Sequence, residues 1–163
     1  MSVKFFAFFL FFALSLEAKE RIVSLSPSIT EILFALDVGD EVVATSSYSL
    51  YPKEARTLPV VGGNQNPSLE KILALAPTLV VGQSYNQNTL NNLNKFHVNT
   101  LKVSLKTLKN IQDSITKLAK KLGKETNAKA LNAKITNAIT NAPKAKTPHS
   151  VMIVYGLRED LAS

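Results

Sequence analysis

Residues 21–36 read RIVSLSPSITEILFAL, a short apolar run followed at once by a helical pattern. The run at residues 21–25 is typical of a β-strand, and from Ser28 onward apolar residues recur every three or four positions. Ser28 and Glu31 have the spacing of a capping box, which closes the first turn of a helix. We therefore predict a strand that leads directly into a helix over residues 28–36.

Outward from this stretch, the alternation of strand and helix continues to residue 104. Asn66 and Pro67 fit the cap and first position of a second helix, and a third helix is predicted over residues 88–96. Further strands are predicted at residues 41–45, 59–61, 78–81 and 101–103. Strands that alternate with helices through short connections predict an α/β fold, in which helices cover both faces of a parallel sheet.

A longer helical pattern occupies residues 105–142, where Leu and Ile recur at steps of three and four. It predicts one long helix, or two helices with a break near Gly123. A polar linker follows, and residues 150–155 form a last β-like run. Because a lone strand cannot bury itself, we interpret residues 143–163 as a linker and the start of a truncated second lobe, after an N-terminal lobe at residues 19–104.

The beginning of the chain, residues 1–18, has the layout of a cleavable signal peptide. Lys4 gives a positive start, residues 5–14 are an unbroken apolar run, and Ala18 is a small residue at the expected cleavage point. The run is shorter than the ~20 residues that span a bilayer, and an uncleaved membrane anchor is the alternative. We predict export to the periplasm through this segment.

Charge is unevenly distributed along the chain, whose net charge is +7. Residues 19–94 contain five Lys and Arg against seven Asp and Glu, whereas residues 95–163 contain thirteen against four. A basic half can indicate a nucleic-acid or membrane partner, but no aromatic residues are interleaved with the lysines of the helical segment to stack on bases. We interpret these lysines as a solvated helix face and expect no nucleic-acid partner.

The sequence contains no recognisable catalytic or metal-binding constellation. Its two histidines, His97 and His149, are far apart, and the chain has no cysteine to join them or to form a disulfide. There is no Gly-x-Ser-x-Gly elbow for nucleophilic catalysis and no Gly-x-x-x-x-Gly-Lys loop for a nucleotide. We therefore predict a binding protein without a cofactor or a metal site, rather than an enzyme.

Three polar loops that follow predicted strands are the candidates for a binding site. The loop at residues 46–52, SSYSLYP, carries Tyr48 and Tyr51, and the two later loops carry Asn64 and Tyr85. In open parallel sheets, ligands bind outside the carboxyl ends of the strands, and tyrosine offers a flat apolar face with a polar tip for a large planar ligand. The alternative is that the tyrosines only cover the edge of the core.

Residues 21–36, 46–52 and 66–81 together resemble the substrate-binding proteins of ABC importers for cobalamin, iron-siderophores or haem. Residues 46–52 are most similar to the loop of the cobalamin-binding members. The resemblance extends in order over residues 21–155, and it implies two α/β lobes bridged by one long helix, with the ligand held between them. It implies that residues 105–142 form this bridging helix.

The resemblance also implies roles for individual residues. Tyr48 corresponds to a ligand contact, with Tyr51, Asn64 and Tyr85 as further candidates. Glu70 corresponds to an acidic group that docks onto arginines of the membrane permease, although a carboxylate also suits the first turn of a helix. Cobalamin-binding members have a tryptophan at the position of Asn64, whereas this chain has none, so siderophore and haem ligands stay open. We expect a monomeric periplasmic carrier; an exported adhesion or interaction module and a non-functional truncated fragment are the alternatives.

Overall fold

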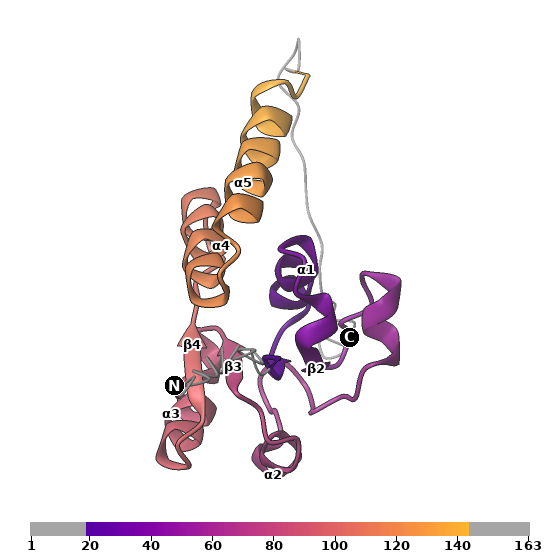
Figure 1. Ribbon diagram of the computed structural model, residues 1–163, viewed down its shortest axis with the longest axis vertical. Coiled ribbons are helices and arrows are strands. Elements are labelled where there is room, and N and C mark those ends of the chain that lie inside the picture. Colours follow the sequence, from indigo (N-terminus) through magenta and orange to yellow (C-terminus); the bar gives the residue numbers. More distant parts are fainter. Residues whose placement is uncertain (1–18, 144–163) are drawn as a thin grey trace, which may run out of the picture.

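The computed structural model describes residues 19–143, which form a four-stranded parallel sheet with helices on both of its faces (Figure 1). The strands are β1 (Ile22–Ser24), β2 (Val42–Ala44), β3 (Leu79–Gly82) and β4 (Asn99–Lys102). The α-helices are α1 (Pro27–Ala35), α2 (Leu69–Ala74), α3 (Gln87–Lys95), α4 (Leu108–Leu122) and α5 (Glu125–Thr140). The predicted α/β fold class is confirmed, whereas the predicted signal peptide and the β-like run at residues 150–155 lie outside the described residues.

The sheet has the strand order β2-β1-β3-β4, so β1 lies between two parallel neighbours. Ile22 of β1 is level with Val42 of β2 on one side and with Leu79 of β3 on the other. The extended piece that contains Val60 makes a single parallel bridge, to Thr45, just beyond β2. Because all four strands run in the same direction, their carboxyl ends lie at one edge of the sheet, which we call the carboxyl edge.

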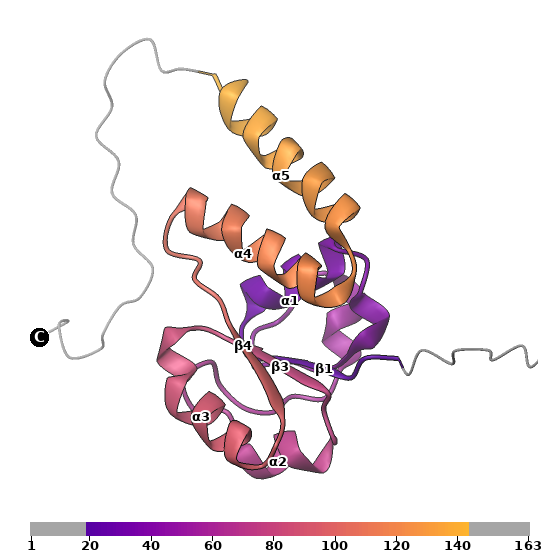
Figure 2. The ribbon, with the colours of Figure 1, turned by 60° about the vertical axis from the view of Figure 1, so that its left-hand side comes forward.

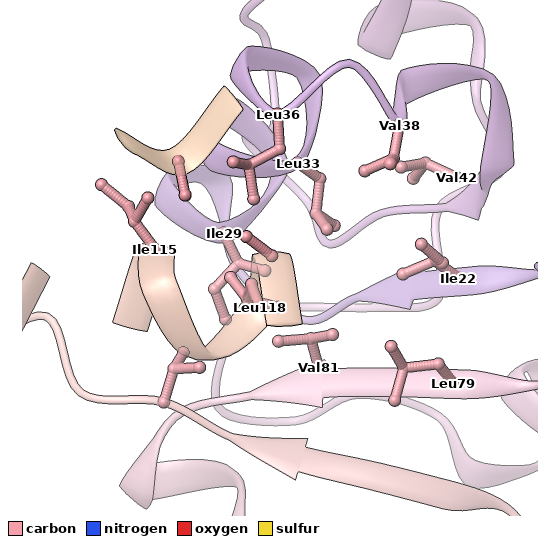
Figure 3. Close-up of a cluster of buried hydrophobic side chains, with 13 residues drawn as sticks. Ile22, Ile29, Leu33, Leu36, Val38, Val42, Leu79, Val81, Ile115 and Leu118 are labelled. Atoms are coloured by element: carbon pink, nitrogen blue, oxygen red, sulfur yellow. The ribbon is translucent and has the colours of Figure 1, made fainter. Parts of the chain in front are cut away.

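Side chains of the central strands alternate between two hydrophobic cores, as the period-two geometry of a strand requires. One core, which includes Ile22 and Val81, lies between the sheet and helices α1 and α4 (Figure 3). The other includes Val23 and Val80 and lies on the face covered by α2 and α3. Burial on both faces explains why the central strands are apolar at nearly every position.

Helix α1 begins at Pro27, and its N-cap is Ser26. The hydroxyl group of Ser26 accepts a hydrogen bond from the backbone N–H of Ile29 at 3.4 Å. Proline suits the first helical position, because it has no N–H to leave unpaired and its fixed φ matches the helix. The predicted capping box of Ser28 and Glu31 is therefore wrong, since the proline moves the start of the helix upstream.

Helix α2 begins later than predicted, with Ser68 rather than Asn66 as its N-cap. The Ser68 hydroxyl accepts a hydrogen bond from the first turn of the helix at 3.2 Å. Pro67 pairs instead with Gly62 in an antiparallel bridge. This bridge keeps Pro67 out of the helix and holds the two ends of the loop at residues 62–67 together.

Helices α4 and α5 are separate, which decides between the two possibilities that the sequence left open. Gly123 ends α4 in the left-handed conformation, with φ of 66°, and the N–H of Lys124 donates to the carbonyl of Ala119 at 2.9 Å. A left-handed residue of this kind is a common way to end a helix. The prediction of two helices with a break near Gly123 is therefore the one that the structure confirms, and a bridge to a second lobe over residues 105–142 stays a prediction.

Helix α5 packs on α4 and forms an outer layer of the molecule. Figure 2 shows that α5 runs back along α4, so that it ends on the side where α4 begins. Ala128 is its one buried residue, and Leu131 and Ile135 are partly buried against the first core. Much of its surface is therefore in solvent. Among residues 19–143, no helix is both long enough and apolar enough to cross a bilayer.

We predict that Gly123→Ala lowers the free energy of unfolding by about 1 kcal/mol, because a residue with a β-carbon is strained in the left-handed conformation. A β-carbon at this position would meet no heavy atom within 4 Å, so the loss is conformational rather than steric. Gly63→Ala is the matched control, since its β-carbon also meets nothing within 4 Å and its φ is not positive. Urea unfolding followed by circular dichroism compares the two, and equal stabilities would contradict the prediction.

Candidate functional site

Loops that leave the carboxyl edge carry the three tyrosines predicted as site residues. Tyr48 and Tyr51 follow β2, and Tyr85 follows β3. They are 79%, 67% and 44% exposed, respectively. Exposed aromatic surface that gathers on one side of a protein indicates a place of contact with other molecules.

The loop of Tyr48 is fixed from beneath by a cluster of buried hydroxyl groups, those of Ser24, Thr30, Ser46 and Ser49. Thr30 Oγ1 lies 2.9 Å from Ser24 Oγ and 3.3 Å from Ser49 Oγ. Ser46 Oγ lies 3.3 Å from Ser49 Oγ. Because a buried hydroxyl is costly to leave unpaired, this network holds the loop in one position relative to β1 and α1.

Tyr48 itself has a left-handed backbone conformation, with φ of 70°. For a bulky residue this conformation is strained by about 1–2 kcal/mol. The turn is closed by a hydrogen bond from the N–H of Leu50 to the carbonyl of Tyr48 at 2.9 Å, and the N–H of Ser47 donates to the carbonyl of Gly62 at 2.8 Å. Asp37, Ala76 and His97 also have a positive φ, so the strain at Tyr48 supports a hypothesis of function only together with its exposed aromatic ring.

Asn86 connects the loop of Tyr85 to the loop of Asn64. Its Oδ1 accepts a hydrogen bond from the N–H of Gln83 at 2.9 Å, and its Nδ2 donates to the carbonyl of Asn64 at 2.6 Å. Gln83 Nε2 donates to the hydroxyl of Tyr85 at 2.9 Å and to Ser26 Oγ at 3.2 Å. The loops after β1 and β3 and the loop of Asn64 therefore form one hydrogen-bonded frame.

Tyr51 lies apart from this frame. Its side chain lines a groove of about 360 Å³ between α1, α4 and α5, together with apolar side chains such as Ile32, Ile115 and Ile135. The structure thus joins the loops of Tyr48, Asn64 and Tyr85 to one another and places Tyr51 toward the helices of the first core.

Glu70 lies in the first turn of α2, where its side chain is exposed. Helix α2 is on the face of the sheet opposite to α4 (Figure 1). Within residues 19–143, the Glu70 carboxylate takes part in no ion pair. It is therefore a free negative charge at the surface, close in sequence to the loop of Asn64.

The residues that hold the loops in place, Ser26, Gln83 and Asn86, were missed by the sequence analysis. The serines that follow β1 and β2 could have indicated this supporting role, because small polar side chains at strand ends commonly form hydrogen bonds with the neighbouring backbone. Asn86 gave no such signal, since it is one of several asparagines in a polar segment. Over the described part of the chain, no three His, Cys, Asp or Glu side chains gather as metal ligands.

A model of the periplasmic binding protein family matches this sequence over residues 22–161. The chain belongs to the periplasmic binding protein family. This membership confirms the resemblance that the sequence motifs predicted. Members of this family are substrate-binding proteins of transport systems. In this binding protein, the loops at the carboxyl edge expose Tyr48, Tyr51 and Tyr85 to solvent.

Its relatives include the vitamin B12-binding protein of Yersinia pestis (strain Pestoides F), which is 48% identical over 65 residues, or 40% of this chain and 23% of the relative. The periplasmic haem-binding protein of Roseiflexus sp. RS-1 in its apo form has a TM-score of 0.70 and 35% identity, over 76% of this chain and 48% of that chain. The periplasmic vitamin B12-binding protein of Vibrio cholerae has a TM-score of 0.68 and 31% identity, over 75% of this chain and 49% of that chain. The match therefore spans about half the length of these solved structures.

We predict that, in this binding protein, Tyr48→Gly is more stable than Tyr48→Ala by about 1 kcal/mol, because glycine adopts a positive φ without strain. At Tyr85, whose φ is not positive, the order is reversed: Tyr85→Gly is less stable than Tyr85→Ala by about 0.5–1 kcal/mol, because glycine gains more freedom in the unfolded chain. Urea unfolding of the four variants gives both differences. The same sign at both positions would contradict a strained backbone at Tyr48.

Proposed function

We propose that this chain captures a large metal chelate, of the cobalamin, ferric-siderophore or haem class, and delivers it to the membrane permease of an ABC importer. It acts as a monomer in the periplasm, which it reaches through the signal peptide at residues 1–18, and it catalyses no reaction. Family membership supports the capture of a substrate. Relatives named for vitamin B12 or haem support this range of ligands.

The observation that carries the proposal is that Tyr48 is exposed and has a strained backbone. It is 79% exposed and has a positive φ, although burial of an aromatic ring would stabilise the fold. The hydroxyl cluster beneath the loop holds the backbone on which the ring is carried. A side chain on a fixed backbone loses less conformational entropy on binding than one on a mobile loop, so Tyr48 is suited to stack against a planar part of a chelate.

Asn64 and Tyr85 supply polar groups beside that ring. Oδ1 of Asn64 is buried and has no hydrogen-bond partner within residues 19–143. A buried acceptor without a partner lowers stability, and a rotation of the Asn64 side chain on binding would bring this oxygen to a donor group on the ligand. The Tyr85 hydroxyl accepts a hydrogen bond from Gln83, which leaves its own proton to donate to a ligand. Tyr51 contributes where a ligand extends over α1.

Glu70 is the residue that we propose for docking on the permease. The support is its exposure, its lack of an ion-pair partner in the described part of the chain, and its match to the acidic docking position of the family. An exposed ion pair contributes only about 0–1 kcal/mol to affinity. Its effect is therefore expected on the orientation and rate of encounter rather than on the strength of the complex.

We predict that Tyr48→Ala weakens binding of the chelate about fivefold or more, the effect of losing an aromatic contact worth about 1 kcal/mol. The purified chain is titrated with cobalamin, haemin and a ferric catecholate, and the shift of the unfolding midpoint with each ligand reports binding.

Phe96→Ala is the matched control for this titration. Phe96 is also an exposed aromatic residue, at 57%, but it caps the end of α3 just before β4 begins and so lies at the opposite edge of the sheet. Its loss should leave affinity unchanged. Unchanged affinity in Tyr48→Ala would remove Tyr48 from the site, and the absence of a midpoint shift with all three chelates would contradict the proposed function.

We predict that Glu70→Gln slows association with the permease a few-fold at low ionic strength, while the affinity for the chelate is unchanged. Surface plasmon resonance on permease in lipid nanodiscs measures the association rate, and the difference should shrink as salt screens the charge. Glu125→Gln is the control, because Glu125 is also exposed in the first turn of a helix. Equal association rates for the two variants would exclude Glu70 from docking.

A further inference from the structure

The carboxyl edge carries, beyond the tyrosines, a pocket of about 330 Å³ at the point where β4 ends and α4 begins. Three lysines, Lys102, Lys106 and Lys117, line it together with polar side chains that include Ser84 and Ser104. We call it the lysine pocket. The sequence analysis interpreted the lysines of this half as a solvated helix face, but Lys102 lies on β4 and Lys106 in the turn that follows it.

The lysine pocket lies at the carboxyl edge, next to the loop that carries Tyr85. Gly82 of β3 is level with Lys102 of β4, so the segments that leave these two strands begin side by side. The first segment leads to Ser84 and Tyr85, and the second leads to Ser104. A ligand in contact with Tyr85 therefore lies next to the wall of the pocket that Ser84 forms.

Two of the three ammonium groups of the pocket, those of Lys102 and Lys117, are held in place without being neutralised. Lys102 Nζ donates to Gln87 Oε1 at 2.6 Å, and Lys117 Nζ donates to the carbonyl oxygen of Lys102 at 2.9 Å. Both acceptors are uncharged. Within residues 19–143, none of the three pocket lysines takes part in an ion pair.

The carboxylate that also lines the pocket, Asp113, does not change this balance. It lies 2.6 Å from Nζ of Lys109, so its charge is matched by a fourth lysine. Three positive charges on exposed side chains are therefore left around one open pocket. Like charges around a pocket repel one another. Water and salt screen this repulsion at exposed side chains, and an anion in the pocket would relieve what is left of it.

Resting on the proposed function, we infer that the lysine pocket binds carboxylate groups at the rim of the captured chelate. The substrate class is then a carboxylate-bearing chelate, such as haem or a ferric carboxylate siderophore. Lysine ammonium groups attract carboxylates as point charges, and the hydroxyl of Ser84 can donate a further hydrogen bond. The hydroxyl of Ser104 already donates its proton to Asn110 Oδ1 at 3.3 Å. A chelate whose rim carries only neutral amides gains less from the pocket, because its amide oxygens accept hydrogen bonds but bear no charge.

Haemin and its dimethyl ester test this inference, because they share metal and macrocycle and differ in whether the carboxylates are ionised. We expect the chain to bind haemin about tenfold more tightly than the ester, the effect of two partly exposed ion pairs. The preference should fall as salt rises. In the double variant Lys106→Gln/Lys117→Gln, the haemin affinity should fall to that of the ester, while the affinity for the ester is unchanged.

The double variant Lys120→Gln/Lys121→Gln is the control, because it makes the same change of net charge at exposed positions of α4 outside the pocket. It should keep the preference for haemin. Absorption titrations measure the porphyrin affinities, and equilibrium dialysis measures cobalamin binding.

Three results would overturn the inference while the proposed function stands. These are equal affinity of the unchanged chain for haemin and the ester, a preference that survives in the pocket variant, and a preference that both double variants lose alike. If haemin, its ester, cobalamin and a ferric catecholate all fail to bind, the proposed function fails and the inference falls with it.

Discussion

The pairing of β1 with two parallel neighbours is the constraint on which the rest of the structure depends. Ile22–Ser24 of β1 pair with β2 on one side and β3 on the other, and they are buried on both faces. Because the neighbours run the same way, each connection must cross back over a face of the sheet, which places helices on both sides. The same geometry brings the loops after all four strands to one edge.

At that edge, the residues that support the loops differ from the residues that are exposed on them. Buried hydroxyls such as those of Thr30 and Ser49, together with the amide of Asn86, position the loops without reaching the surface. Tyr48 and the pocket lysines face outward and stabilise the fold little. A preorganised site needs both kinds of residue, because a contact is effective only when its support limits the number of conformations.

The fold and the exposed tyrosines were predictable because they depend on local patterns. Apolar runs such as residues 78–81 indicate buried parallel strands, and the loops after them must lie at the carboxyl edge. The predicted first residues of α1 and α2 were wrong, because a single hydrogen bond, such as the one that Ser26 accepts, decides where a helix begins. The roles of Asn86 and Lys102 could not be predicted, because they depend on contacts between segments that only the pairing of β3 with β4 brings together.

Helix α5 has a weaker attachment than any other long element of the described chain. Ala128 is its one buried residue, whereas α4 buries Ile115 and Leu118 in the first core. Elements with little buried apolar surface open locally at a lower free energy than the global unfolding of the domain. The amide hydrogens of α5 should therefore exchange with solvent while those of the sheet stay protected. Helix α5 would then unfold locally as a separate unit, with Gly123 as the boundary.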